Sequence, residues 1–272
     1  MPDMDIKRFI PFAKSPPKVA VVRLSGAIGI TRPGAAGLSD AALAPLLQRA
    51  FKRGKPVAVA LLINSPGGSP VQSSLIAARI RRLAEETGVP VHAFVEDVAA
   101  SGGYWLATAA DDIWADSASL IGSIGVISSG FGLDGFIARH GIERRVHTAG
   151  TSKSFMDPFR PQKPEDIERL KAILEPMHAI FKAQVTGRRG AKLSTERDLF
   201  TGDVWLGEEA ARLGLIDGVA HAVPKLKALY GEKMRLIPYG QKRGLLSRFG
   251  MNLVGGALDL AEERALWARF GL

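Results

Sequence analysis

The stretch VAVALLINSPGGS, from Val57 to Ser69, decides the fold of this 272-residue chain. Its first seven residues, Val57 to Ile63, form an unbroken apolar run, which is typical of a strand covered on both faces in a parallel sheet. A helical pattern follows from Ser69 to Glu86, and a further apolar strand runs from Val91 to Val95. This order of strand, helix and strand predicts right-handed βαβ crossovers and an α/β domain built on a parallel sheet.

The alternation of strands and helices continues on both sides of this unit. Further strands are expected at Lys18–Ser25, around Ile113 and Trp114, near Arg145–His147 and around Ile216–Ala220, and helices at Ser39–Lys52, after Ser101, near Phe136, at Glu165–Val185 and near Gly207–Leu213. We expect an N-terminal extension over residues 1–17, one folded domain over residues 18–222, and a basic, partly amphipathic C-terminal extension over residues 223–272. That extension would pack on a neighbouring subunit or lie on a membrane. Gly255 and Gly256 interrupt its apolar stripe, which favours subunit packing.

Composition limits the function further. The 46% hydrophobic and 23% charged residues are those of a globular protein, and the absence of cysteine removes disulfides, thiolate catalysis and cysteine-based zinc sites. The net charge of +9 is concentrated in residues 221–272, which hold nine Lys/Arg against four Asp/Glu, and no nucleic-acid motif accompanies it. No apolar stretch suits a signal peptide or a spanning helix. We therefore expect a cytoplasmic or peripherally membrane-associated protein that does not bind nucleic acid.

No metal or cofactor is expected. The segment Gly130–Gly135 matches the dinucleotide pattern GxGxxG. A dinucleotide site would also need an acidic residue at a strand end about 20 residues later, and Ala149 to Thr151 stand there instead. We interpret the match as chance.

Two loops rich in Gly and Ser follow predicted strands and precede predicted helices. In Asn64–Ser69 the two glycines let the backbone approach a ligand with its N–H groups outward, as an oxyanion hole requires, although a tight turn explains the motif about equally well. In Ala99–Tyr104 the small neighbours of Ser101 leave its hydroxyl accessible to a substrate carbonyl. A helix N-cap is the commoner role for such a serine, so this loop alone does not identify a nucleophile.

A nucleophilic serine needs a base, and Lys153 is the better candidate. His92 lies inside an apolar strand, and none of the other four histidines adjoins a Gly/Ser-rich loop with a paired acid. Lys153 lies 52 residues after Ser101 among small residues. A lysine accepts a proton at neutral pH only when burial lowers its pKa from about 10.4 towards 7, and most lysines are solvated surface charges.

Four motifs in register resemble the signal peptide peptidase A (protease IV) family. They are INSPGGS at 63–69, AASGGY at 99–104, GSIGV at 122–126 and SKS at 152–154, the last followed by Asp157-Pro158-Phe159. The resemblance extends over about residues 18 to 222. It implies a crotonase/ClpP-like α/β fold of repeated ββα and βαβ units, with flanking helices, and a serine peptidase that uses a Ser–Lys dyad.

The resemblance also implies roles for individual residues. Ser101 matches the nucleophile, Lys153 the general base, and Ser123 a serine that orients the lysine. Gly68 and Gly102 match the backbone donors of the oxyanion hole. Single-copy members assemble into rings in which serine and lysine meet across a subunit boundary, so a homo-oligomer, a tetramer or octamer, is expected, with peptides or unfolded polypeptides as substrates.

Some features depart from that family. Ser152 stands where an aromatic residue commonly precedes the lysine, and the N-terminal anchor of membrane-bound members is missing.

Two alternatives stay open. A crotonase-type acyl-CoA enzyme would use carboxylates near the second glycine loop, for which Glu96 and Asp97 are available. An inactive homologue acting as a scaffold would have an exposed Lys153.

Overall fold

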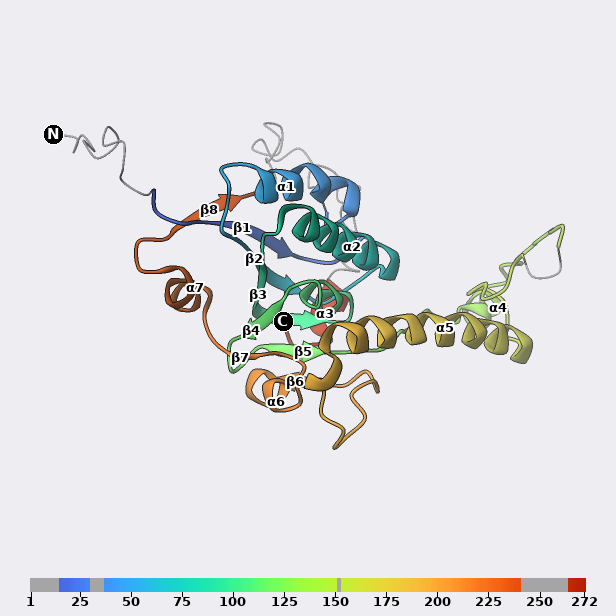
Figure 1. Ribbon diagram of the computed structural model, residues 1–272. Helices are drawn as coiled ribbons and strands as arrows, with labels where there is room; N and C mark the ends of the chain where they lie inside the picture. Colours follow the sequence, from blue (N-terminus) through green and yellow to red (C-terminus); the bar gives the residue numbers. More distant parts are fainter. Residues whose placement is uncertain (1–14, 30–36, 151–152, 241–263) are drawn as a thin grey trace.

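The structure is a computed structural model that describes residues 15–29, 37–150, 153–240 and 264–272. Figure 1 shows a body built around one twisted sheet and a long arm that projects from it. We define the arm as residues 126–150 and 153–163 together with the N-terminal half of helix α5 (Pro164–Arg189). The body therefore contains the sheet, and the arm contains the segment around Lys153.

The sheet has eight strands and is almost entirely parallel. Its main path runs in the order β6-β5-β3-β2-β1-β8, while β4 pairs with β3 and β7. The strands are β1 (Lys18–Ser25), β2 (Ala58–Ser65), β3 (Val91–Ala100), β4 (Asp112–Ala115), β5 (Leu120–Gly122), β6 (Val204–Leu206), β7 (Gly218–Val219) and β8 (Arg235–Tyr239). Among the strand pairs of the described residues, only β5–β6 is antiparallel. The predicted α/β fold with a parallel sheet core and flanking helices is confirmed.

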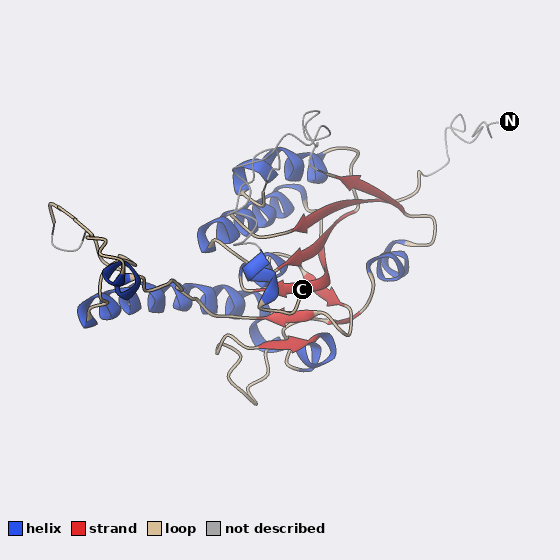
Figure 2. Ribbon diagram, turned by 180° about the vertical axis from the view of Figure 1, so that it is seen from behind, coloured by secondary structure: helices blue, strands red, loops and turns tan. Residues whose placement is uncertain are grey.

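Helices cover both faces of the sheet (Figures 1 and 2). Helices α1 (Asp40–Lys52), α2 (Pro70–Thr87) and α3 (Gly102–Ala107) pack on the larger core cluster, while α7 (Ala222–Tyr230) closes a smaller cluster on the other face through Leu226. Helix α4 (Asp134–Arg139) lies in the arm and α6 (Gly207–Arg212) beside β6, and a short 3-10 helix, η2 (Gly190–Lys192), follows α5. Because both faces are covered, β2 is buried along nearly its whole length, as its apolar run predicted.

Short-range signals set the helix ends. The side chains of Ser39 and Ser69 accept hydrogen bonds from the backbone N–H groups of Ala42 and Gln72, so both serines cap their helices. Gly88 ends α2 in the left-handed conformation. The crossovers that these helices make bring the carboxyl ends of β2, β3 and β5 to one edge of the sheet, where the two glycine loops lie.

The expected strand near Arg145–His147 is wrong. These residues lie in the arm as exposed coil, and Arg145 pairs with Glu143 two residues earlier. A strand there would have no neighbouring strand to satisfy its backbone N–H and C=O groups. The residues themselves do not show whether a neighbouring strand is present.

The folded body continues past the expected domain boundary at residue 222. Strand β8 pairs in parallel with β1, from Lys18 opposite Arg235 to Val22 opposite Tyr239. It covers an edge of β1 that would otherwise expose unpaired backbone groups. Part of the expected C-terminal extension, residues 241–263, lies outside the described residues. In the described parts of the chain, no helix combines the length and apolar character needed to cross a bilayer.

Candidate active site

Ser101 occupies a strained turn between β3 and α3. Its φ of 51° and ψ of −122° lie in a region that side-chain-bearing residues rarely adopt. Its N–H donates to the carbonyl of Gly122 at 2.8 Å, which fixes the turn against the end of β5. Its hydroxyl makes no capping bond, in contrast to Ser39 and Ser69. The geometry is that of a sharp strand-to-helix turn with a half-buried serine whose hydroxyl is uncapped, and it argues against the N-cap interpretation.

The first glycine loop lies directly against Ser101. A methyl group on Gly67 would come within 2.8 Å of the Ser101 Cβ and 3.0 Å of the Gly102 nitrogen, so only glycine permits this approach. Gly68 has a φ of 139°, and a methyl group there would lie 2.2 Å from the Ile28 carbonyl oxygen. The loop is therefore clamped between the segment at Ile28 and the turn at Ser101.

The backbone N–H groups at this point include unpaired donors. Within the described parts of the chain, the N–H of Gly68 has no acceptor, whereas the N–H of Ser69 donates to Ile28 at 2.8 Å. Gly102 is the first residue of α3, where N–H groups have no partner within the helix. The loop of Gly67 and Gly68 thus lies against Gly102, and the N–H groups of Gly68 and Gly102 have no backbone acceptor among the described residues.

Ser123 follows the same edge of the sheet. It comes directly after Gly122, has a φ of 51°, and donates its N–H to the Asp203 carbonyl at 2.7 Å. Its side chain is nearly buried. Four of the five predicted site residues, namely Ser101, Ser123, Gly68 and Gly102, therefore gather at the ends of β2, β3 and β5.

Lys153 is not part of this group within one chain. It lies in the arm, exposed, and its N–H donates to the Gly150 carbonyl at 3.3 Å. Figure 1 shows the arm leading away from α3 and the sheet, with the start of α5 at its far end. The single chain therefore separates the predicted base from the predicted nucleophile.

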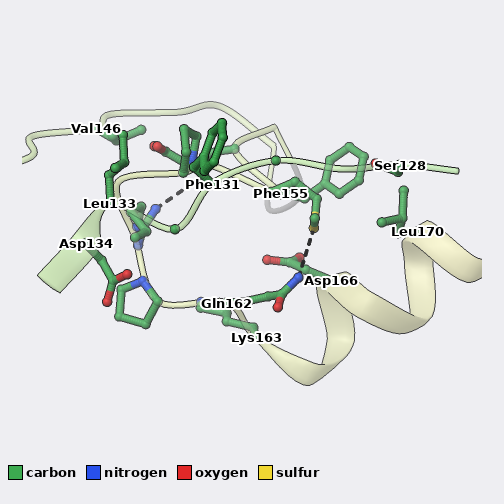
Figure 3. A pocket seen from close by; sticks show the side chains of 18 of the residues that line it. Ser128, Phe131, Leu133, Asp134, Val146, Phe155, Gln162, Lys163, Asp166 and Leu170 are labelled. Atoms are coloured by element: carbon green, nitrogen blue, oxygen red, sulfur yellow. Dashed lines mark hydrogen bonds between the residues drawn. The ribbon is translucent and has the colours of Figure 1, made fainter. Parts of the chain in front are cut away.

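The arm encloses a cavity of about 1180 Å³. Figure 3 shows Leu133 on one side of this cavity and Asp166 and Leu170, both on α5, on the other. The N–H of Leu133 donates to the Pro158 carbonyl at 2.6 Å, which closes this loop. The GxGxxG segment lines the cavity and does not connect a strand of the sheet to a helix, so it lacks the setting of a dinucleotide site.

The histidines have other partners. His92 is buried and hydrogen-bonds to Asp112 at 2.8 Å and to the Tyr230 hydroxyl at 2.6 Å, which ties α7 to the sheet. His178 contacts the Ile124 carbonyl at 3.1 Å. All five histidines are among the described residues, and none hydrogen-bonds to Ser101 there.

The acidic residues near the loops are also engaged. Glu96 pairs with Arg23, and Asp97 accepts a hydrogen bond from the Asn64 side chain at 2.5 Å. In the described residues, no three His, Asp or Glu side chains are grouped closely enough to hold a metal ion.

A comparison with family profiles now decides the family. The profile of peptidase family S49 matches residues 84–229, which include Ser101, Ser123 and Lys153. The chain belongs to peptidase family S49. The resemblance to the signal peptide peptidase A (protease IV) family is confirmed, since proteins named putative signal peptide peptidase SppA and protease 4 are also similar to this chain.

Two relatives of this S49 chain are much longer proteins. It is 48% identical, over 98% of its length and 39% of the relative, to a Brucella melitensis protein named Na⁺/H⁺ antiporter NhaA. It is 30% identical, over 88% of its length and 37% of the relative, to the chloroplastic serine protease SPPA of Arabidopsis thaliana. The chain thus spans about two fifths of the length of these curated relatives.

One solved structure aligns with most of the S49 chain. A mutant of the 1510-N membrane-bound stomatin-specific protease, in complex with a substrate peptide, aligns with a TM-score of 0.47 at 16% identity, over 87% of this chain and 98% of the other.

One network under α3 was not foreseen from the sequence. The buried Tyr104 donates its hydroxyl proton to the Leu215 carbonyl at 2.7 Å, and burial raises its pKa. Arg189, at the end of α5, donates to Gly214 and pairs with Asp217 at 2.7 Å. This network anchors the base of the arm beneath the helix that begins after Ser101. The spacing of these residues gave no signal, because the partners are far apart in sequence.

Proposed function

We propose that this S49 chain is a serine endopeptidase in which Ser101 attacks the peptide carbonyl and Lys153 of a neighbouring copy acts as general base. One observation carries the proposal. The Ser101 hydroxyl is uncapped on a strained turn, beside the available N–H groups of Gly68 and Gly102. Unpaired donors next to an uncapped hydroxyl are what acyl transfer requires.

The proposed reaction has two halves. The uncharged amine of Lys153 takes the proton of Ser101 as Oγ bonds to the carbonyl carbon, and the N–H groups of Gly68 and Gly102 hold the oxyanion. The lysine then protonates the amine as the C–N bond breaks, leaving an acyl ester on Ser101. Water, deprotonated by the same lysine, attacks this ester and releases the carboxylic acid, which restores the serine.

Assembly from several copies is part of the proposal. Lys153 belongs to the arm, which leads away from α3 (Figure 1), and this supports a pair formed between chains. Apolar side chains of the arm are exposed in the single chain, including Phe131 at 84%. A homo-oligomer, a tetramer or octamer, would cover them and exclude water from the amine. Ser123, next to Gly122 at the edge of the sheet, would orient the incoming lysine.

We propose peptides and unfolded polypeptides, including cleaved signal peptides, as substrates. The name of the Arabidopsis relative, a serine protease, supports proteolysis.

We further propose that the protein acts in the cytoplasm or bound peripherally to a membrane through its basic residues 221–272. Sedimentation with vesicles containing anionic lipid would test that location.

The direct experiment uses single variants of the full chain. Ser101→Ala and Lys153→Ala should each lower kcat/KM on casein by at least about a thousandfold, because each removes a group that acts in the transition state. Lys171→Ala is the matched control, since Lys171 is also an exposed lysine of the arm and pairs only with Glu168 among the described residues. It should keep the wild-type rate.

One alternative keeps a specific observation in its favour. Lys153 is exposed in the single chain, as an inactive scaffold would require. Casein cleavage that is absent in the wild type, or equal in wild type and both variants, would favour the scaffold. Binding of coenzyme A by calorimetry would instead favour the acyl-CoA enzyme.

A further inference from the structure

The loop that carries Gly68 has a mechanical difficulty. Gly67 and Gly68 both have positive φ angles and no side chains, so the conformation of the loop depends on neighbouring groups, among them the Ile28 backbone that clamps it. Oxyanion donors must nevertheless be fixed before the reaction, because reorganisation during the reaction reduces their effect. Some other group must therefore fix this backbone.

Ser65 is the side chain placed to do so. It is the last residue of β2 and is fully buried. Its hydroxyl donates to the Gly26 carbonyl at 2.7 Å and accepts from the Gly67 N–H at 3.3 Å. One hydroxyl thus bridges the turn after β1 and the glycine loop after β2.

The bridge also determines which N–H stays available. The N–H of Gly67 donates to the Ser65 hydroxyl, and the N–H of Ser69 donates to the Ile28 carbonyl. In the described chain, the N–H of Gly68 is therefore the one of these three donors that has no acceptor. The Ile28 N–H donates to the Gly67 carbonyl at 2.8 Å, which fixes the peptide plane that ends in the Gly68 nitrogen. Rotation of that plane would break the bond to Ile28.

Ser65 contacts the second half of the site as well. A methyl group on Gly103 would lie 2.3 Å from the Ser65 carbonyl oxygen and 3.1 Å from its Cβ, so α3 begins directly on Ser65. The same residue therefore supports the Gly68 loop and the first turn after Ser101.

We infer that Ser65 is a positioning residue that, together with the backbone of Ile28, sets the direction of the Gly68 N–H in the oxyanion hole. The inference rests on the proposed function. Ser65 does not touch the substrate; it acts through the Gly67 peptide. Its loss should therefore weaken the transition state and leave the binding of the ground state unchanged.

A buried serine with the same bonding pattern provides the control. Ser119 is also buried, donates its hydroxyl proton to the Glu96 carbonyl, and accepts from the Asp116 N–H at 3.0 Å. It supports the turn before β5 and not the glycine loop. Ser65→Ala and Ser119→Ala should lower Tm by similar amounts, because each loses one buried bridging hydroxyl.

The test compares these variants on a casein-derived peptide that the wild type cleaves. Ser65→Ala should lower kcat about tenfold to a hundredfold, with KM within about twofold, whereas Ser119→Ala should keep kcat within about twofold. The C-terminal aldehyde of the acyl fragment, which forms a tetrahedral adduct with Ser101, should lose affinity for Ser65→Ala in parallel with kcat. The corresponding carboxamide, which forms no adduct, should bind as it does to wild type.

The outcomes separate the inference from the function on which it rests. Equal kcat in wild type and Ser65→Ala, or an equal loss in Ser119→Ala, would overturn the role of Ser65 alone. A wild type without turnover would overturn the proposed function along with it. If Ser65→Ala does not fold, Ser65→Cys fills the site with a weaker hydrogen-bonding atom. It should show the same parallel loss of kcat and aldehyde affinity, and an unchanged kcat would overturn the inference.

Discussion

The N–H of Ser101 donates to the carbonyl of Gly122 at 2.8 Å, and this bond joins the turn that carries Ser101 to the end of the strand that precedes Ser123. Ser101 follows the end of β3 and Gly122 ends β5, which pairs with β3 in parallel. The bond holds Ser101 at its positive φ and places Ser123 next to it along the sheet edge. The strain at Ser101 is therefore maintained by the sheet rather than by the serine itself.

That strain can be measured at Ser101. Both Ser101→Ala and Ser101→Gly should abolish peptide cleavage, but only glycine relieves the positive φ. Ser101→Gly should be more stable than Ser101→Ala by about 1 kcal/mol, which corresponds to about 2 °C in Tm. Differential scanning calorimetry of the two variants checks this, and a Ser101→Ala variant that melts at the same temperature or higher would show that the turn is not strained.

The contact between Gly102 and Ser73 gives a second prediction. A methyl group on Gly102 would lie 2.4 Å from the Ser73 Oγ, so Gly102→Ala should destabilise by about 1–3 kcal/mol. Adding Ser73→Ala removes that oxygen and should recover more than half of the loss. Thermal melts of the single and double variants measure this coupling, and simple additivity would contradict it.

A glycine in an open position is the control for that experiment. A methyl group added to Gly187, inside α5, would meet no atom of another element within 4 Å. Gly187→Ala should stabilise by about 0.5–1 kcal/mol, because alanine loses less backbone entropy in a helix than glycine does. Destabilisation by both substitutions would indicate that the Gly102 effect is not steric.

The ion pair of Asp217 predicts a pH dependence of stability. Burial of Asp217 favours its neutral form, but hydrogen bonds from Arg189, Lys192 and the Ile113 N–H outweigh it and hold the pKa below the ordinary 3.8. A lowered carboxyl pKa stabilises the fold above the unfolded-state value, and this contribution is lost as the pH falls through the folded-state value. Asp217→Asn should therefore lower Tm at pH 7.

The gap in Tm between wild type and Asp217→Asn should stay constant down to about pH 5 and shrink below about pH 4. Asparagine keeps an oxygen for the Ile113 N–H, so the change tests the charge. Melting curves recorded from about pH 3 to pH 7 give the measurement. A gap that persists unchanged to the acid end of that range would contradict the lowered pKa.

Local patterns in the sequence predicted local structure well. The apolar run that became β2 and the caps at Ser39 and Ser69 depend on neighbours within a few residues. The glycine loops at Gly68 and Ser101 were found for the same reason. The glycines of these loops are visible in the sequence. The structure gives the reason for them: no side chain fits between Gly67 and Ser101.

Long-range relationships could not be predicted in this way. The pairing of β8 with β1, and the separation of Lys153 from Ser101, depend on how distant segments meet. Ser65 was part of a quoted motif, but its role needs the position of Gly26, 39 residues earlier. Nothing in the local pattern around Ser65 contains that position.

Mixing two inactive variants tests most directly whether Ser101 of one chain and Lys153 of another act together. Ser101→Ala keeps the lysine and Lys153→Ala keeps the serine, so subunits unfolded and refolded together at equal concentration can form intact pairs. With one serine and one lysine donated at each ring interface, about a quarter of the wild-type casein cleavage should return. No recovery in mixed oligomers, with both variants shown to be present in the same particle, would contradict the shared site.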